Sequence, residues 1–302
     1  MNHRLALVTV GAAIARDRRQ VIADLVALTK PRVVLMVLMT TVVGYYIGLA
    51  GAPDYGRVLH LVVGTLLAAG GALALNQHGE RDVDALMHRT RSRPLPAGRL
   101  QPHEALSFGV AITVLGVACL AANVNLLAAL VTGATAAIYV WGYTPLKLRT
   151  PLCTVVGAVS GALPPVTGWV AAREDLSAGA WVLFGILFLW QLPHTLAIAR
   201  LYRDDYARAG VRLLPVVDAG GASTGRQSVI SCLALLIVGP LPALLGLAGA
   251  FYLLAAFALG VVFVALATRQ ALRPSASAAR WVLFASLLYL PVLLTVLALD
   301  KQ

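Results

Sequence analysis

The acidic residues best placed to do chemistry lie in two short segments, and the first of them carries Asn76, Glu80 and Asp84. On a helix, each step of four residues advances about 40°, so these three side chains project from one face. Asp82 points nearly opposite to Glu80. Two carboxylates and an amide form an oxygen-only ligand set, which suits Mg²⁺ bound together with substrate phosphates. The spacing therefore predicts a magnesium site.

Three arginines crowd into the five residues that begin at Arg89, directly after these carboxylates; the other two are Arg91 and Arg93. Guanidinium groups bind phosphate oxygens through two parallel hydrogen bonds. A magnesium site beside arginines at a membrane surface points to a diphosphate with an apolar tail. The alternative interpretation is a solvated loop whose charge is balanced by carboxylates at a helix end.

The second segment begins with Trp190-Gln-Leu-Pro-His194 and continues through Tyr202, Arg203 and Asp205. If one helix runs on past Arg200, His194 and Asp205 share a face of it. An ionisable residue inside a membrane usually faces a cavity, which favours a ligand role for His194. A histidine hydrogen-bonded to a neighbouring helix is an equally open alternative.

Two further features support a cavity. Tyr143, Lys147 and Arg149 stand at the end of an apolar run, where the two cations could bind the same phosphates. Two cations in a cytoplasmic loop, however, need no special reason. Pro164 and Pro165 interrupt the next apolar run, and broken backbone is tolerated in a membrane only where it packs in protein or lines a cavity.

The elements that must position these residues are membrane-spanning helices. Of the 302 residues, 59% are hydrophobic and 12% are charged, whereas soluble domains average about 45–50% and about 25%. This composition excludes a soluble enzyme, a disordered tail and a disulfide-stapled secreted domain. The three cysteines stand singly in apolar stretches, so neither a disulfide framework nor a cysteine metal site is predicted.

Nine apolar runs are long enough to cross a bilayer core, which needs roughly 20 residues per helix. We therefore predict an all-α, polytopic transmembrane bundle: one domain over residues 31–302, preceded by a cytoplasmic amphipathic arm over residues 1–30. A cleaved signal peptide in residues 1–15 is the alternative, but the arginines that follow at once oppose export. The nine runs are residues 33–51, 58–77, 104–123, 125–143, 152–172, 178–199, 227–248, 250–268 and 281–299.

The distribution of basic residues predicts the orientation. Of the 24 Lys and Arg, 21 fall in the N-terminal arm and in the loops after the second, fourth, sixth and eighth runs. The positive-inside rule then predicts a cytoplasmic N-terminus and, with an odd number of spans, a C-terminus on the opposite side. Topology thus explains the formal charge of +11, and no nucleic-acid partner is predicted. The loops after helices 2 and 6, which carry the two acidic segments, are both expected to be cytoplasmic.

The stretch from Asn76 to Pro94 resembles the first aspartate-rich motif of the UbiA-type intramembrane prenyltransferases. The similarity narrows to the protoheme IX farnesyltransferase (heme O synthase) branch of that family and covers about residues 25–300. Two departures stand out: Glu80 replaces a usual aspartate, and Tyr202-x-x-Asp205 replaces the paired aspartates of the superfamily. The further stretches that carry the resemblance are residues 28–33, 143–147, 161–169, 190–194 and 205–215.

The resemblance implies a reaction in which heme b, farnesyl diphosphate and water give heme o and diphosphate. It also implies a multi-pass protein of the cell inner membrane, with a heme-modifying enzyme or an oxidase assembly factor as a downstream partner. The implied catalytic residues are Asn76, Glu80, Asp84 and Asp205, of which Glu80, Asp84 and Asp205 hold Mg²⁺. The implied diphosphate-binding residues are Arg89, Arg93, Lys147 and Arg149, and the heme-binding candidates are His194, Tyr202 and Arg203.

Two other functions fit parts of the sequence. A prenyltransferase of the same superfamily could act on a quinone precursor or a chlorophyll-type ring, although the segments around His194 and Asp205 argue against it. A transporter would also have many helices with intramembrane proline and histidine. Its polar sites usually lie near the bilayer midplane, whereas the acidic residues here gather at the cytoplasmic surface.

Overall fold

The computed structural model describes residues 18–218 and 220–302, and within these ranges the chain is almost entirely helical. The only extended pairing in this part is a single antiparallel bridge between Ala248 and Lys301. Nine helical segments there are long and apolar enough to cross a membrane, which confirms the predicted all-α polytopic bundle. Most of the predicted N-terminal arm, with the alternative signal peptide, lies outside the described residues.

The nine spans follow one another as the sequence predicts, although several ends differ. Three of them combine shorter helices, and three further short helices lie outside the spans. The spans are α2 (Pro31–Gly48), α3 (Tyr55–Ala85), α4 (Pro102–Asn123), α5 (Leu126–Ala137) with η1 (Ile138–Tyr143) and α6 (Thr144–Leu146), α7 (Cys153–Ala162) with α8 (Pro164–Arg173), α9 (Ala178–Leu201), α12 (Ala222–Val238) with α13 (Leu241–Leu244), α14 (Ala250–Leu272) and α15 (Ala276–Leu299). The others are α1 (Arg18–Leu28), α10 (Arg203–Arg208) and α11 (Leu214–Val217).

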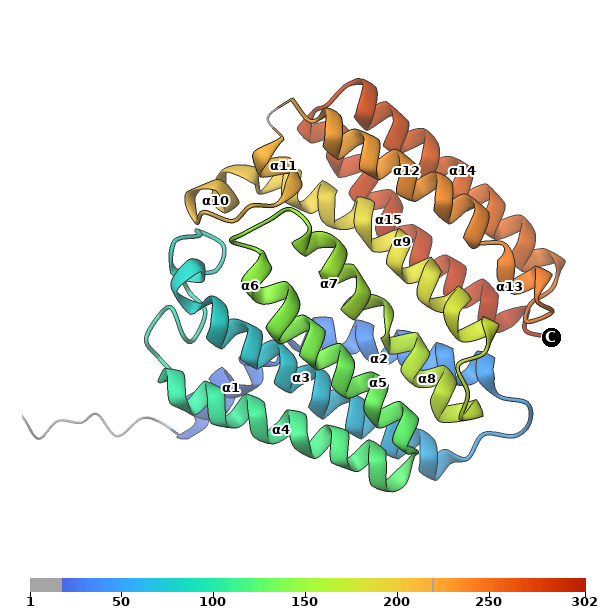
Figure 1. Cartoon of the computed structure of the whole chain (residues 1–302), viewed down its shortest axis with the longest axis horizontal. Coiled ribbons are helices and arrows are strands. Elements are labelled where there is room, and N and C mark those ends of the chain that lie inside the picture. Colours follow the sequence, from blue (N-terminus) through green and yellow to red (C-terminus); the bar gives the residue numbers. More distant parts are fainter. Residues whose placement is uncertain (1–17, 219) are drawn as a thin grey trace, which may run out of the picture.

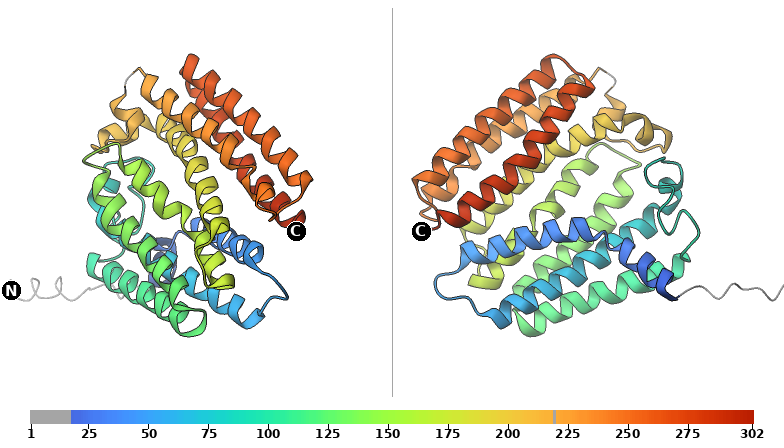
Figure 2. Two further views of the ribbon diagram at one scale, coloured as in Figure 1. Left: turned by 45° about the vertical axis from the view of Figure 1, so that its right-hand side comes forward. Right: turned by 180° about the vertical axis from the view of Figure 1, so that it is seen from behind.

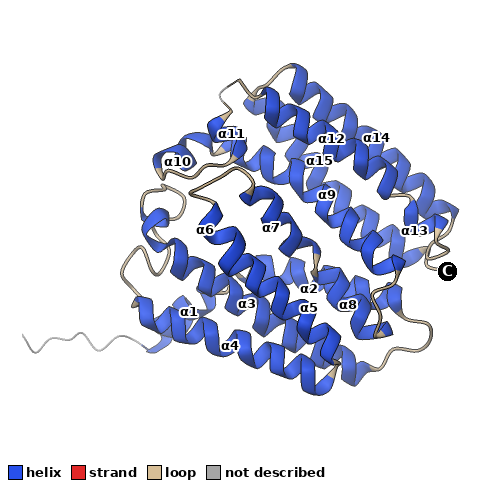
Figure 3. Ribbon diagram, in the orientation of Figure 1, coloured by secondary structure: helices blue, strands red, loops and turns tan. Residues whose placement is uncertain are grey.

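The helices form two groups joined by α9. In Figures 1 and 2, α1 to α8 lie together, and α12, α14 and α15 form a separate stack, with α9 packed against both. Figure 3 shows that loops and short helices connect successive membrane spans at the two ends of the bundle. The loop after α3 meets α10 and α11 at one of these ends (Figure 1). The two polar segments of the sequence are therefore neighbours in space.

Small residues bring the first group of helices into backbone contact. A methyl group added at Gly71 of α3 would lie 2.1 Å from Thr113 Oγ1 of α4, and one added at Gly168 of α8 would lie 1.8 Å from the Thr41 carbonyl oxygen of α2. Helix pairs that approach this closely through small residues are typical of membrane bundles. The contacts fix α2, α3, α4 and α8 relative to one another, so polar groups on them are held at set distances.

The helix α3 is longer than the hydropathy pattern predicts. Its apolar run ends near residue 77, but the helix continues to Ala85. Asp54 begins it, because its side chain accepts a hydrogen bond from the Arg57 main-chain nitrogen, the usual N-cap arrangement. The polar residues of the first acidic segment are thus helical, and not part of the loop.

Candidate active site

The last three turns of α3 carry a buried polar face. Asn76, Glu80 and Asp84 are 1%, 8% and 1% exposed, whereas the Asp82 side chain is 86% exposed. This confirms the prediction that the three residues share one face and that Asp82 points away. Buried carboxylates are stable only when they are paired or hydrogen-bonded, so their partners define the site.

Two cations pair with the two buried carboxylates, one from a distant segment and one from the loop that follows α3. Lys147 Nζ lies 2.6 Å from Glu80 Oε1, and Arg93 Nη1 lies 2.6 Å from Asp84 Oδ2. The second oxygen of Asp84, Oδ1, is buried and has no hydrogen-bond partner within residues 18–218 and 220–302. An unpaired carboxylate oxygen on the same helix face as a second carboxylate and an amide offers a donor set that fits Mg²⁺ bound together with substrate phosphates.

Lys30 is a member of this cluster to which sequence reasoning gave no role. Its Nζ donates to Asn76 Oδ1 at 3.2 Å, and the Tyr139 hydroxyl donates to the same oxygen at 3.3 Å. Burial, with the positive charges of Arg93 and Lys147, lowers the pKa of Lys30 to about 7. Lys30 precedes the first proline of α2 and has φ 49°, which turns its side chain back under the helix end. The Lys-Pro pair just before an apolar run was the signal in the sequence.

A π-helical segment positions Lys147. Within η1, Tyr139 and Tyr143 stack with ring centroids 5.3 Å apart, and Lys147 Nζ lies 4.4 Å from the Tyr143 ring centroid. Burial alone would lower the pKa of Lys147, but Tyr143 and the Glu80 carboxylate together raise it well above its ordinary value. Lys147 therefore stays protonated and positively charged at neutral pH. Single π turns are frequent at functional sites because they re-aim side chains.

These charged groups line one open cavity, here called the polar cavity, of about 1270 Å³. Arg89 adds a guanidinium that lies 5.4 Å from the Tyr202 ring centroid and donates to the Tyr206 hydroxyl at 3.3 Å. The predicted diphosphate ligands Arg89, Arg93 and Lys147 thus gather around the carboxylates, as expected. The charged and aromatic lining residues are Lys30, Arg32, His78, Glu80, Asp84, Arg89, Arg93, Tyr139, Trp141, Tyr143, Lys147 and Tyr206.

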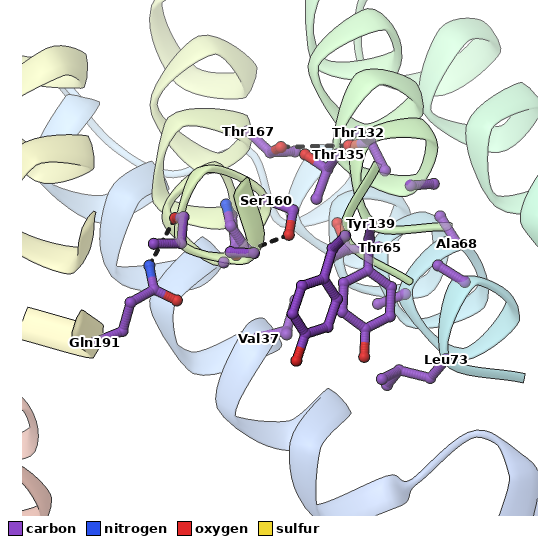
Figure 4. A pocket seen from close by; sticks show the side chains of 18 of the residues that line it. Val37, Thr65, Ala68, Leu73, Thr132, Thr135, Tyr139, Ser160, Thr167 and Gln191 are labelled. Carbon is purple, nitrogen blue, oxygen red and sulfur yellow. Dashed lines mark hydrogen bonds between the residues drawn. The ribbon is translucent and has the colours of Figure 1, made fainter. Parts of the chain in front are cut away.

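A second cavity of about 250 Å³, here called the membrane cavity, adjoins the polar cavity and lies among the helices of the bundle. Tyr139 and Tyr143 line both cavities. Figure 4 shows Tyr139 between hydroxyl groups on one side and apolar side chains on the other. The wall is mostly apolar but carries an amide and several hydroxyls, those of Thr65, Thr132, Thr135, Thr154, Ser160, Thr167, Gln191 and Thr195.

The predicted break in the fifth span lies beside the membrane cavity. The span divides at Leu163 into α7 and α8 because Pro164 and Pro165 supply no main-chain N–H. Gly161 and Pro164 both line the cavity. The interruption is therefore where the sequence predicts it, at a cavity wall inside the bundle.

Asp205 contacts the loop after α3. It accepts hydrogen bonds from the main-chain nitrogens of His88 at 2.9 Å and Arg89 at 3.4 Å, and it pairs with Arg208 on its own helix. These bonds, against the opposing effect of burial, hold the pKa of Asp205 below its ordinary value. Asp205 thus fixes the turn that carries Arg89. Its predicted role as a metal ligand stays a prediction.

The helix that carries His194 ends earlier than the shared-face argument requires. α9 ends at Leu201, and Tyr202, with φ −108° and ψ 25°, separates it from α10. The premise of one continuous helix is wrong, because this turn redirects the chain before Asp205. His194 Nδ1 lies 2.8 Å from Ser286 Oγ of α15, the arrangement described by the alternative interpretation.

The other predicted site residues lie at the margin of the cavities. Arg149 is exposed and lines neither cavity. Neither His194 nor Arg203 lines them, whereas Tyr202 reaches the site through its contact with Arg89. In the described part of the chain, no three His, Cys, Asp or Glu side chains gather closely enough to hold a metal on their own. A metal at Glu80 and Asp84 would therefore need oxygens from a ligand.

The sequence matches one family over most of its length. The profile of the UbiA prenyltransferase family matches residues 37–289. A protein of Solibacter usitatus, named protoheme IX farnesyltransferase, is 48% identical over 92% of this chain and 98% of its own length. A protein of Koribacter versatilis with the same name is 42% identical over 92% of this chain and 93% of its own length.

Solved structures show the same fold. A digeranylgeranylglyceryl phosphate synthase superposes with a TM-score of 0.77 at 17% identity, over 92% of this chain and 98% of that one. A UbiA homologue of Archaeoglobus fulgidus, bound to GPP and Mg²⁺, superposes with a TM-score of 0.63 at 17% identity, over 91% of this chain and 99% of that one. At this identity the likeness establishes the helical arrangement.

Proposed function

The chain belongs to the UbiA prenyltransferase family, and from this membership we propose that it transfers the farnesyl group of farnesyl diphosphate to a vinyl group of heme b, giving heme o. Relatives that carry the name protoheme IX farnesyltransferase align over 92% of the chain at up to 48% identity. Water adds in the same reaction, and diphosphate leaves. The observation that carries the proposal is the polar cavity, where two paired carboxylates and five Lys and Arg side chains surround one space, beside a mostly apolar cavity that shares Tyr139 and Tyr143 with it.

The polar cavity supplies what a departing diphosphate needs. Glu80 and Asp84 would hold Mg²⁺, which supplies charge neutralisation on the diphosphate, and the amide oxygen of Asn76 would join them once Lys30 and Tyr139 release it. Lys147 and Arg93 pair with those carboxylates through side chains that can turn toward phosphate oxygens. Positive groups that are already in place stabilise the charge that develops on the leaving group. Lys30 and Arg89 extend this positive lining to both sides of the cavity.

The aromatic pair at the junction suits the carbon centre. When the bond from farnesyl C1 to the diphosphate oxygen breaks, positive charge spreads over the allylic carbons. The faces of Tyr139 and Tyr143 border that position and attract a cation. The farnesyl chain would extend into the membrane cavity, among the apolar residues of α3, α5 and α7. The vinyl carbon then attacks C1, and water completes the product as its hydroxyl.

The heme side of the site rests on less direct contacts. We propose that the heme lies against the edge of the polar cavity nearest α10, where Tyr202 and Arg203 follow the end of α9. Their side chains would meet the heme propionates, and Arg149 would add a further charge at the mouth. His194 reaches the heme only if its bond to Ser286 opens. The predicted downstream partner stays a prediction.

The orientation in the membrane is proposed from the distribution of Lys and Arg among the loops. The chain is a multi-pass membrane protein with nine candidate spans in the part described. We propose the cell inner membrane, with the polar cavity and the N-terminus on the cytoplasmic side and the C-terminus opposite. The excess of Lys and Arg in the loops at that end supports this orientation.

A product assay tests the proposal. Membranes that contain the protein are supplied with heme b, farnesyl diphosphate and Mg²⁺. The products are separated by chromatography and identified by mass spectrometry. We expect a heme that has gained the farnesyl group and one water, and we expect it to disappear in Glu80→Gln and Asp84→Asn. Prenylation of an added aromatic acid with no heme product would move the chain to a quinone branch. Prenylation of neither acceptor would make transport the function to test.

A further inference from the structure

The wall of the membrane cavity carries one amide whose oxygen has no partner. Gln191 of α9 donates its Nε2 to the Ala158 carbonyl oxygen of α7 at 2.7 Å. Among the described residues, none donates a hydrogen bond to its Oε1. Figure 4 shows this oxygen directed toward the cavity, across from Ser160. The amide is thus anchored on one side and offers an acceptor on the other.

Gly161 makes room for this acceptor. A methyl group added there would lie 2.2 Å from Gln191 Oε1, closer than any side chain could approach. The amide therefore lies flat across the α7 backbone, held by the bond to Ala158 behind it. Such an amide cannot turn to pair its oxygen elsewhere without losing that bond.

Because the Gln191 oxygen lies against Gly161, its height along α7 can be compared with that of the aromatic pair where the reacting carbons are proposed to lie. One turn before Gly161, a methyl added at Gly157 would lie 2.8 Å from the Tyr143 ring. Residues four apart on a helix lie on one face, about 6 Å apart along its axis. The Gln191 oxygen is therefore one helical turn deeper than the aromatic pair that borders both cavities.

The same wall carries a second unpaired polar group. Thr154 of α7 is 5% exposed and lines the membrane cavity, and its buried Oγ1 has no hydrogen-bond partner in the part of the chain that the structure describes. Buried polar groups without partners are rare and call for a partner such as water. Thr195, one turn from Gln191 on α9, lines the same side. These groups form a polar strip in a mostly apolar cavity.

We propose that Gln191 is the positioning residue for the water that is consumed in the reaction. This inference rests on the proposed function, in which attack of the vinyl carbon on farnesyl C1 leaves a cation on the other vinyl carbon. The water donates one hydrogen to Gln191 Oε1, so its lone pair faces that carbon. The new bond joins the water oxygen to the cation, and the displaced proton passes to the released diphosphate.

The cation has a competing fate that makes the role measurable. Without a positioned water, it loses a proton from the neighbouring CH₂ to the diphosphate and gives an alkene. That product is lighter than heme o by one water. The ratio of hydroxylated to alkene product therefore reports water capture alone, because both products share every earlier step.

The experiment compares this ratio in the parent and in Gln191→Met, which keeps the side-chain length and removes the acceptor. We expect the ratio to fall on the order of tenfold, the effect of losing one well-placed hydrogen bond. Gly161→Ala retains the glutamine but displaces its amide, and we expect a fall in the same direction. Label from ¹⁸O-water should appear in the residual hydroxylated product.

Gln77→Met is the matched control. The Gln77 amide donates to the Leu28 carbonyl oxygen at 2.7 Å, a bond of the same kind and length between segments, but Gln77 lines neither cavity. We expect it to lower the yield of folded protein and leave the product ratio unchanged.

The outcomes separate this inference from the proposed function. Farnesylated heme with an unchanged ratio in Gln191→Met overturns the role of Gln191, and so does an equal change in Gln77→Met. If Gln191→Met gives no product at all, an unchanged ratio in Gly161→Ala is decisive against the inference. Absence of any farnesylated heme from the folded parent overturns the proposed function instead.

Discussion

The two acidic segments differ in what binds their carboxylates. In α3, Glu80 and Asp84 pair with the side chains of Lys147 and Arg93, which come from other parts of the chain. In α10, Asp205 accepts from main-chain nitrogens of the turn after α3 and from Arg208 on its own helix. Both segments have acidic residues among arginines in the sequence. The carboxylates of the first face a cavity, whereas Asp205 of the second links α10 to the turn after α3.

The difference teaches how to separate a ligand-binding carboxylate from a structural one. A side-chain cation can turn from a carboxylate to a phosphate, because its stem rotates. A main-chain N–H cannot leave its acceptor unless the turn itself unfolds. Carboxylates paired with cations at a cavity are therefore free to exchange partners when a charged substrate arrives. A carboxylate held by backbone donors keeps the geometry of its neighbours.

The largest effect should come from the carboxylates of α3. Glu80→Gln and Asp84→Asn each remove the charge that pairs with a cation and would hold Mg²⁺, so we expect kcat/KM to fall on the order of 10³-fold. Steady-state formation of farnesylated heme in detergent or membranes measures this. Asp82→Asn makes the same kind of change on the exposed face, and we expect a change within about twofold. A loss in Asp82→Asn equal to that in Asp84→Asn would contradict the assignment of the face.

The cations that pair with these carboxylates should rank next. Lys147→Met removes a fixed charge beside Glu80, and we expect kcat to fall on the order of 10²-fold. Arg149→Met removes a charge two residues away that lines neither cavity, and a several-fold smaller loss is expected. Release of diphosphate from farnesyl diphosphate and Mg²⁺ measures both. Equal losses would mean that the two cations act together at the mouth of the cavity.

Asp205→Asn decides whether Asp205 only positions the turn that carries His88 and Arg89, or also binds metal. The variant weakens the bonds to His88 and Arg89 but keeps the side-chain shape, so we expect about a tenfold loss, chiefly as a higher KM for farnesyl diphosphate. The exposed neighbour Asp204 supplies the control, Asp204→Asn. A loss as large as that of Glu80→Gln, with an altered dependence on Mg²⁺ concentration, would instead make Asp205 a metal ligand.

Much of the fold could be predicted because it depends on local patterns. Apolar runs of about 20 residues specify the spans, four-residue spacing specifies the face of Asn76, Glu80 and Asp84, and paired prolines specify a break. The apolar run ends before α3 does, because hydropathy does not register the polar residues of its last turns, although their four-residue spacing indicated a helix. Partners that include Lys147, 67 residues after Glu80, make burial of those residues favourable, and no local pattern contains that information.

Members of the site that come from separate segments were the hardest to predict. Lys30 and Tyr139 join it through contacts with Asn76, 46 and 63 residues away. For His194 a ligand role and a bond to a neighbouring helix were both open; its Nδ1 lies 2.8 Å from Ser286 Oγ of α15, and the ligand role stays a prediction. A sequence gives the chemistry of each side chain, whereas the identity of its partner depends on how helices pack.

The smallest predicted effect concerns Asp218, a carboxylate with no place in the chemistry. Its Oδ2 accepts from the Thr224 main-chain nitrogen at 2.8 Å and from the Thr224 hydroxyl at 3.0 Å, in the first turn of α12. Although burial opposes them, these bonds hold the pKa of Asp218 below its ordinary value. We expect Asp218→Asn to lower the free energy of unfolding at neutral pH by about 1 kcal/mol.

The pH dependence of that difference has a definite sign. Because folding depresses the pKa of Asp218, the stabilisation is present above the unfolded pKa of about 3.9 and is lost as pH falls through the folded value. The difference in melting temperature between parent and Asp218→Asn should therefore be constant from pH 7 to about pH 5 and shrink as the pH falls below about 3.9. Thermal unfolding in detergent measures it. A difference that grows as the pH falls would contradict stabilisation of the charged carboxylate by Thr224.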